Sequence, residues 1–266
     1  MSEQPPVLAI EGVSKYYGGL RALHHVTLHA RAGEVVGLVG DNGAGKSTLL
    51  KIVAGAQPAT SGEILIEGTP RSFGSPMEAV EAGISTVYQD LALAMQRSVA
   101  ANFFIGRELV AEGWLGRRLG WLDTTSMTHR TKEELARLHT RIPNVSVMCK
   151  ELSGGQRQAL AIARAAAWCR RVLLLDEPTS ALGVEQQHEV LDLIRRIRSQ
   201  GVAIILVSHQ MQDVVSVCDR VTVLRLGEVA ATLDKDELSV DALVGYITGA
   251  RRRESAPAAP EPSGGS

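Results

Sequence analysis

The sequence predicts an α/β fold with a mainly parallel sheet, and three observations lead to this prediction. Unbroken aliphatic runs at residues 172–175 and 202–207 are typical of parallel strands that are covered on both faces. Residues 184–200 carry apolar side chains three and four positions apart, which indicates an amphipathic helix. A glycine-rich turn at residues 40–45 lies between another apolar run and a helical stretch, as in a strand–turn–helix unit.

Composition narrows the possible functions. At 266 residues the chain is long enough for one domain with an insertion or for two small domains. The 28 basic and 29 acidic residues give a net charge of −1, which weighs against a nucleic-acid partner. The 3 cysteines lack C-x-x-C spacing, so we expect reduced thiols. Neither a signal peptide nor an apolar run of membrane-spanning length is evident, so we expect any role at a membrane to depend on partner proteins.

The glycine-rich turn satisfies the phosphate-loop pattern, in which glycine and four further residues precede Gly-Lys-Ser/Thr. Glycines let successive backbone N–H groups point at phosphate oxygens, and the following helix N-terminus adds partial positive charge. Lys46 is expected to reach the β- and γ-phosphates, and the Ser47 hydroxyl to bind Mg²⁺. The alternative is a glycine-rich turn without a ligand, and it is disfavoured because the strand before the turn and the helix after it both fit the pattern. The predicted nucleotide-binding residues here are Gly40, Asn42, Gly43, Ala44, Gly45, Lys46, Ser47 and Thr48.

The other elements are read in chain order from periodicity and turn residues. In the first half we expect strands at 7–13, 22–30, 34–39, 61–68 and 84–89, a turn at 16–19, and helices at 47–54 and 76–82. Residues 91–139 have a helical pattern with little β-branching, which predicts a helical insertion. Its clearest helix is 123–140, which contains the capping-box pattern Thr131-x-x-Glu134.

The second half continues the alternation. We expect helices at 153–168, 184–200 and 237–247, strands at 171–176 and 202–207, and a hairpin of 220–226 with 229–233 around Gly227. Residues 251–266 are too polar and too rich in proline to pack, so a disordered tail is predicted. Its arginine triplet is compatible with contact to anionic lipid, but a solvated tail is favoured.

Two acidic residues follow the aliphatic run at 172–175. Asp176 ends the aliphatic run, where a parallel sheet presents ligand groups, and a carboxylate at this place in phosphate-loop enzymes holds Mg²⁺. Glu177 would lie beyond the γ-phosphate and accept a proton from an attacking water, a role worth about 10²–10⁴ in rate. The upstream phosphate loop favours this interpretation over a solvated strand end.

A second helix start has the features of an anion site. Ser153 can cap the helix while Gln156 reaches back to it. Gly154 and Gly155 leave the first-turn amides bare, with the helix dipole behind them. An ordinary helix start has the same capping pattern, so residues 153–156 alone do not distinguish an anion site from a simple helix cap.

Taken together, these motifs resemble the ATP-binding cassette (ABC) ATPases. The resemblance rests on Leu-Ser-Gly-Gly-Gln-Arg-Gln at 152–158, on Leu-Leu-Leu-Asp-Glu-Pro-Thr-Ser at 173–180, and on their order after the phosphate loop. It covers roughly residues 7–250. It implies a phosphate-loop NTPase (RecA-like) core with an antiparallel β subdomain and an inserted helical subdomain. The ATP-binding domain would span 1–250, with the core at about 1–89 and 160–250, the helical subdomain at about 90–159 and the tail at 251–266.

The resemblance also implies roles for single residues. ATP and Mg²⁺ would be the cofactors, with Ser47, Gln89 and Asp176 at the metal. Gln89 would be the lid glutamine that relays to a membrane partner, and His209 the switch histidine at the γ-phosphate. Tyr17 would stack on adenine, although the adjacent Tyr16 leaves the choice of ring open. The implied catalytic residues are Glu177, His209 and Gln89.

The resemblance further implies a head-to-tail dimer, in which each nucleotide lies between one chain's phosphate loop and the other's turn formed by Ser153, Gly154, Gly155 and Gln156. The sequence departs from the family pattern at Gly183, where the family usually has Asp. Glycine lacks the carboxylate that helps to couple the two sites across the dimer. This form is similar to monosaccharide importer ATPases.

The stretch 87–108 is similar to ribose-, xylose- and fructose-type importers. The implied partners are a second copy of the chain, two transmembrane permease subunits and, indirectly, a periplasmic sugar-binding protein, with no nucleic acid. The implied location is peripheral, on the cytoplasmic face of the inner membrane. An ATPase of another transport system, a soluble ABC ATPase acting on nucleic acid or ribosomes, and a small-molecule kinase are the alternatives.

Overall fold

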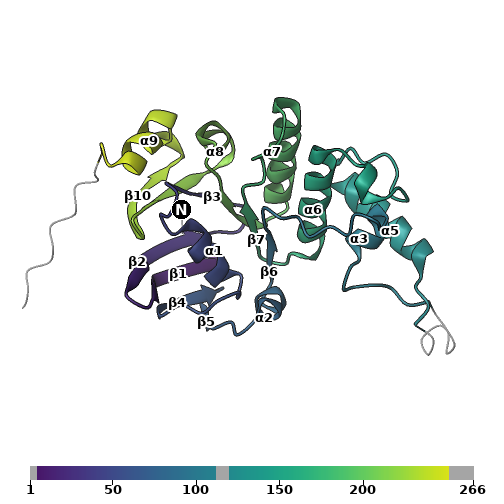
Figure 1. Ribbon diagram of the computed structural model, residues 1–266, viewed down its shortest axis with the longest axis horizontal. Helices are drawn as coiled ribbons and strands as arrows, with labels where there is room; N and C mark the ends of the chain where they lie inside the picture. The colour runs from purple at the N-terminus through teal and green to yellow at the C-terminus, as the bar shows by residue number, and fades with distance from the viewer. Residues whose placement is uncertain (1–4, 112–119, 252–266) are drawn as a thin grey trace, which may run out of the picture.

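The computed structural model describes residues 5–111 and 120–251 (Figure 1). The tail expected at 251–266 lies outside the described residues apart from Arg251, and so do residues 112–119 of the expected helical insertion. Within the described ranges the strands form two sheets, one of six strands and one of four. No helix in these ranges has the length and apolar character needed to cross a membrane.

The larger sheet has the predicted parallel centre. Its strand order is β10-β9-β3-β8-β7-β6, and all neighbours are parallel except β9 and β10, which form the expected hairpin. The bounds are β3 Val35–Gly40, β6 Ile84–Val87, β7 Val172–Asp176, β8 Ala203–Val207, β9 Arg220–Arg225 and β10 Glu228–Asp234.

Side chains of the central strands are buried on both faces, which explains why their sequence runs do not alternate. In β3, Val36 and Leu38 pack into a core shared with α1 and the smaller sheet. Val35 and Val39 point the other way, into a core shared with the helices on the opposite face.

The smaller sheet is antiparallel, in the order β2-β1-β4-β5. Its strands are β1 Leu8–Tyr17, β2 Leu20–Ala30, β4 Ser61–Ile66 and β5 Thr69–Arg71. The expected four-residue turn at 16–19 is shorter in the structure, because Tyr16 and Tyr17 pair with Arg21 and Leu20. Gly18 and Gly19 alone make the turn, and the φ of 57° at Gly18 suits glycine.

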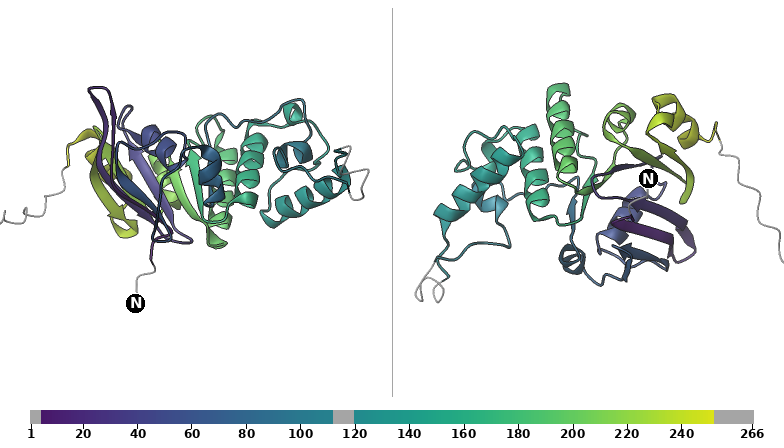
Figure 2. Two further views of the ribbon diagram at one scale, coloured as in Figure 1. Left: turned by 90° about the horizontal axis from the view of Figure 1, so that it is seen from below. Right: turned by 180° about the vertical axis from the view of Figure 1, so that it is seen from behind.

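The helices are α1 Lys46–Val53, α2 Pro76–Glu81, α3 Val99–Phe103, α5 Thr124–Arg137, α6 Gly154–Trp168, α7 Val184–Ser199, α8 Met211–Val217 and α9 Val240–Thr248. Helices α3, α5 and α6 lie together beyond the β6 edge of the large sheet (Figures 1 and 2). The Thr131-x-x-Glu134 pattern is not a capping box: Thr131 lies inside α5 and donates to the Met127 carbonyl. Asp123 caps that helix instead, accepting from the Ser126 N–H at 2.9 Å.

Candidate functional site

The phosphate loop connects β3 to α1, and the glycines at its two ends, Gly40 and Gly45, occupy positions where a Cβ would clash. Gly40 has a φ of 154°, and a Cβ there would lie 2.2 Å from the Leu224 carbonyl oxygen. Gly45 caps α1 with a φ of 104°, and a Cβ there would lie 2.6 Å from the Leu23 side chain. The close packing of β9 and β2 against the loop therefore requires glycine at both ends.

Lys46 holds the loop in shape. Its ammonium donates to the carbonyl oxygens of Gly40 at 2.8 Å and Asp41 at 2.9 Å. Burial lowers the pKa of Lys46, and the nearby carboxylates of Glu177, Asp41 and Asp176 oppose this shift. The ammonium thus lies among backbone oxygens at the mouth of the loop, where an incoming phosphate would meet it.

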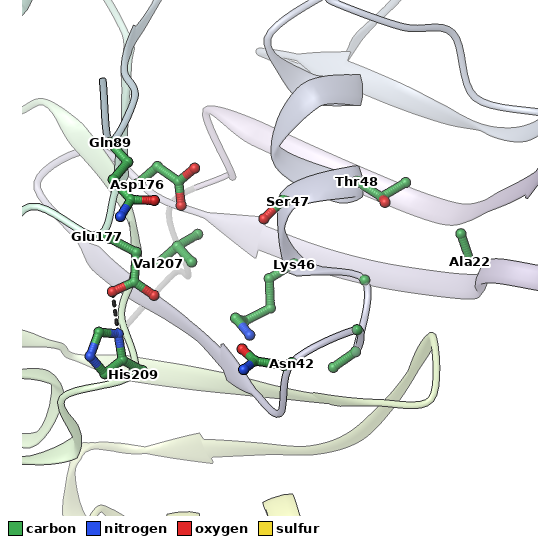
Figure 3. Close-up of a pocket in the computed structure, with 13 residues that line it drawn as sticks. Ala22, Asn42, Lys46, Ser47, Thr48, Gln89, Asp176, Glu177, Val207 and His209 are labelled. Atoms are coloured by element: carbon green, nitrogen blue, oxygen red, sulfur yellow. Dashed lines mark hydrogen bonds and ion pairs between the residues drawn. The ribbon is translucent and has the colours of Figure 1, made fainter. Parts of the chain in front are cut away.

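A cavity of about 380 Å³ lies in front of the loop and brings together residues from distant parts of the chain. Its wall includes the loop from Asn42 onward, the start of α1 through Thr48, and the side chains labelled in Figure 3. Gln89, two residues after β6, lies across the cavity from the loop. Ala22 and Val207 also line it, and neither was identified from the sequence because small apolar residues carry no chemical signal.

Asp176, the last residue of β7, faces Ser47 across the cavity (Figure 3). Burial raises the pKa of the Asp176 carboxyl, the Glu177 charge raises it further, and Lys46 and Lys51 act in the opposite direction. A hydroxyl, a carboxylate and the Gln89 amide are oxygen donors of the kind that Mg²⁺ prefers. The residues present therefore fit a magnesium ion, which would also relieve the repulsion between the two carboxylates.

Glu177 pairs with His209. The Glu177 Oε2 atom contacts His209 Nδ1 (Figure 3). The Glu177 side chain is 18% exposed and that of His209 is 61% exposed, so the histidine stands on the solvent side of the pair. The Glu177 N–H donates to the Val207 carbonyl at 2.9 Å, which ties the acid to the end of β8, two residues before His209. The carboxylate is thereby held at the wall of the cavity.

Neither tyrosine considered for adenine stacking lines this cavity. The Tyr17 hydroxyl donates to Gln57 Oε1 at 2.7 Å, and Gln57 in turn donates to the Thr48 carbonyl on α1 at 3.2 Å. The Tyr16 hydroxyl instead lies 3.3 Å from His24 Nδ1. Tyr17 is therefore the ring connected to the phosphate-binding helix.

The turn at the start of α6 has the predicted reciprocal caps but lies away from the cavity. Ser153 Oγ accepts from the Gln156 N–H at 3.2 Å, and Gln156 Oε1 accepts from the Ser153 N–H at 2.9 Å. Gly155 packs against α7, where an added Cβ would lie 2.9 Å from Gln186 Cγ. Residues 153–156 do not line the cavity of their own chain.

Helix α7 begins after Gly183, which occupies its N-cap with no side-chain acceptor. Gln187 on the first turn donates to the carbonyl of Leu182 at 3.1 Å and so steadies the loop from Glu177 to Gly183.

The fold and this cavity define a class of protein. A phosphate loop between a central parallel strand and a helix, opposed by a strand-terminal aspartate and a glutamate–histidine pair, is the site of a phosphate-loop nucleoside triphosphatase.

Comparison with known proteins identifies the family within that class. Residues 23–180 match the family model described as ABC transporter. The chain is 42% identical to the fructose import ATP-binding protein FrcA of Rhizobium meliloti over 249 residues, which cover 93% of this chain and 96% of the relative. It is 44% identical over 246 residues to the ribose import ATP-binding protein RbsA 2 of Burkholderia pseudomallei (strain 1710b), covering 92% of this chain but only 47% of that relative. This protein belongs to the ABC transporter ATP-binding family.

Solved structures agree with the fold. The ADP conformation of the ATP-binding cassette MJ1267 superposes with a TM-score of 0.78 at 24% identity, covering 92% of this chain and 100% of that one. A dimeric post-hydrolysis state of the cassette MJ0796, bound to ADP and phosphate, superposes with a TM-score of 0.70 at 26% identity, covering 86% of this chain and 98% of that one. The expected α/β core with an antiparallel β subdomain is confirmed.

Proposed function

We propose that this protein is the ATP-hydrolysing subunit of a monosaccharide importer. The observation that carries the proposal is the convergence of Lys46, Asp176 and the Glu177–His209 pair on one cavity. The names of the relatives, which include fructose and ribose import ATP-binding proteins, support the transport role and the sugar class.

The geometry suggests how hydrolysis proceeds. The loop amides and Lys46 hold the β- and γ-phosphates of ATP, and their charges stabilise the oxygens as the terminal bond breaks. Glu177 accepts the proton of a water aligned for attack on the γ-phosphorus. His209 contacts Glu177 and would orient its carboxylate next to the γ-phosphate. Mg²⁺ held by Ser47, Gln89 and Asp176 would supply further charge stabilisation on the phosphate oxygens.

We propose that the working form is a head-to-tail dimer. The turn at 153–156 carries bare amides at a helix N-terminus, yet it lies away from the cavity of its own chain. A second copy, arranged as dimeric cassettes are, would place that turn over the nucleotide. Tyr17 would stack on the adenine at the other end, held by Gln57.

We propose that a groove outside the nucleotide cavity is the surface that binds the permease. It has a volume of about 720 Å³ and lies between α2, the chain after α3, and the end of α6. Met77 and Ile105 at its sides are 66% and 47% exposed, and Trp168 lies at its wall. A pair of permease subunits that insert helices into this groove of each copy would hold the dimer at the cytoplasmic face of the inner membrane, with a periplasmic sugar-binding protein delivering the sugar.

The proposal is tested with Glu177→Gln. We expect this variant to keep ATP affinity within about twofold and to lose at least about 10²-fold in turnover, because only the proton acceptor is removed. With ATP it should accumulate as a dimer in analytical ultracentrifugation. Lys46→Ala is the companion variant and should lose nucleotide binding. Turnover within a few-fold of the parent in the glutamine variant would refute the assignment of Glu177. Unchanged sugar uptake by cells in which this protein is deleted would refute the transport role.

A further inference from the structure

The segment that follows Gln89 is attached to a different part of the molecule from the strand that precedes it. Val87 pairs with Leu175 in the large sheet. Beyond Gln89, the Cys149 N–H donates to the Arg97 carbonyl and the Lys150 N–H to the Met95 carbonyl, both at 3.0 Å. The chain thus passes from the sheet to the helical group within a few residues, and Gln89 lies in that crossing.

Arg164 binds the backbone just beyond the crossing. It lies on α6, and its guanidinium donates through Nη2 to the Leu91 carbonyl at 3.1 Å and through Nη1 to the Ala92 carbonyl at 3.3 Å. Arg164 is partly buried, so water competes less for these oxygens than at an open surface. Two donors in a rigid plane fix both the position and the direction of the backbone they bind.

The backbone is bent to make this contact. Consecutive carbonyls of an extended chain point in opposite directions, so one guanidinium cannot ordinarily reach both. Ala92 has a φ of 48°, a strained value for a residue with a Cβ, and its N–H is bound by Asp90 Oδ1 at 3.2 Å. The strained turn brings the two carbonyls to the same side, toward α6.

The rest of the segment is held just as closely. The Asn102 side chain is fully buried. Its Oδ1 accepts from the Ala94 N–H at 2.7 Å, and its Nδ2 donates to the carbonyls of Ala94, Arg97 and Ser98 at 2.9–3.2 Å. Residues 91–98, called the strap below, are therefore bound along their length by Arg164 at the start and by Asn102 further on.

We propose that Arg164 is a positioning residue that makes α6 follow Gln89. When Gln89 moves toward the γ-phosphate, the strap moves with it, and Arg164 transfers the movement to the helix. The turn at 153–156 lies at the N-terminus of the same helix, about 15 Å away along its axis. The state of one nucleotide site is thereby transmitted to the turn that faces the other copy's nucleotide. This inference rests on the proposed function, because it requires Gln89 to respond to ATP.

The test is a double-mutant cycle on ATPase activity. Gln89→Ala and Arg164→Met should each lower kcat about tenfold and leave ATP affinity within about twofold. Because both variants interrupt the same connection, the double variant should lose about tenfold rather than about a hundredfold. Arg164→Lys, which keeps the charge but can bind only one carbonyl well, should fall between the parent and Arg164→Met.

Arg171→Met is the matched control. Arg171 also donates to a backbone carbonyl, that of Ala82 at 3.1 Å, and it pairs with Glu67 at 2.8 Å, but it lies just before β7 and not at the crossing. Its effect on kcat should be small and should multiply with that of Gln89→Ala. A hundredfold loss in the Gln89–Arg164 double variant, or a folded Arg164→Met protein with the parent's kcat, would overturn the inference. If Gln89→Ala itself leaves kcat unchanged, the proposed role of Gln89 fails and the inference fails with it.

Discussion

At the scale of single residues, the backbone at Glu177 explains how two neighbouring carboxylates serve one cavity. Adjacent residues of a strand point to opposite faces, so Asp176 and Glu177 would diverge if β7 simply continued. Glu177 instead has a φ of 53°, a conformation that is costly for glutamate and is concentrated at functional sites. The strand ends at Asp176, the chain turns, and both acids line the cavity (Figure 3).

The raised pKa of Asp176 predicts that this residue opposes folding at neutral pH. Burial and the neighbouring Glu177 raise its pKa in the folded state above the unfolded value. The folded protein therefore holds the proton more tightly, and stability falls as the pH rises through the folded pKa. Without nucleotide or metal, Asp176→Asn should unfold at a higher temperature than the parent at pH 7, and this advantage should shrink as the pH is lowered toward 4. Its Mg²⁺-dependent ATPase activity should be lost.

Asp192→Asn provides the control for that experiment. The Asp192 carboxylate is exposed on α7 and pairs with Arg195 at 2.7 Å, so its removal should not stabilise the protein at pH 7. If Asp176→Asn lowers the unfolding temperature at pH 7, the attraction between Asp176 and Lys46 outweighs the cost of burying the carboxylate.

Sequence reasoning anticipated the residues of the cavity that carry recognisable chemistry. Lys46, Gln89, Asp176, Glu177 and His209 are separated in the chain, and the structure brings them to one cavity. Which of Tyr16 and Tyr17 bonds to Gln57 was not predictable, because it depends on the register of β1 and β2. The positive φ of Glu177 was equally hidden, since only tertiary packing forces glutamate into that conformation.

At the scale of elements, the start of α7 has room for the carboxylate that the family usually carries there. Gly183 has φ −70° and ψ 161°, values that suit an N-cap residue, and a Cβ would meet no atom within 4 Å. An acceptor side chain at the N-cap would therefore fit without a clash, and glycine provides no such acceptor.

Gly183→Asp should stabilise the protein by a few tenths of a kcal/mol, because aspartate binds the free N–H groups of the first turn and complements the helix dipole. Gly183→Ala should destabilise it, because alanine offers no acceptor and is a poorer cap than glycine. The measurement is urea unfolding of the three proteins, with the midpoint order Asp, Gly, Ala. Equal midpoints for aspartate and alanine would mean that the cap does not limit the stability of the domain.

Elements with a strong pattern were predictable even when short, as α2 and β6 were, and short elements with a weak pattern were not. The helix expected at 184–200 is α7 within one residue. Helix α8 was missed because its seven residues are not preceded by a capping side chain or a proline, whereas Ser75 and Pro76 mark the start of the shorter α2. Strand β5 was missed because three exposed residues including Pro70 leave no alternation to detect. The capping error at Thr131 arose because the residue pattern alone does not reveal where a helix begins.

At the scale of the whole molecule, the 720 Å³ groove lies apart from the nucleotide cavity, so the proposed permease contact can be tested separately from ATP binding. It lies between α2 and the end of α6, and none of its lining residues lines the nucleotide cavity. Ile105→Asp should place a charge in the groove, reduce recovery of the protein with permease-containing membranes at least about tenfold, and leave ATP affinity within about twofold.

Val244→Asp is the matched control, because Val244 is similarly exposed at 44% but lies on α9, outside the groove. It should bind membranes like the parent. Equal loss for both variants would indicate a general effect of surface charge, and no loss for Ile105→Asp would place the permease contact elsewhere.

The strand order of the large sheet has a consequence for the order of events during synthesis. The strand that precedes the phosphate loop, β3, is flanked by β8 and β9, which leave the ribosome more than a hundred and sixty residues later. The antiparallel sheet is complete by Arg71 and is free to assemble early. A nascent chain that ends before Ala203 holds the whole Gly-Lys-Ser-Thr segment but neither neighbour of its strand. We therefore expect the growing polypeptide to acquire ATP binding only late in synthesis, and fragments that end before Ala203 to bind ATP poorly.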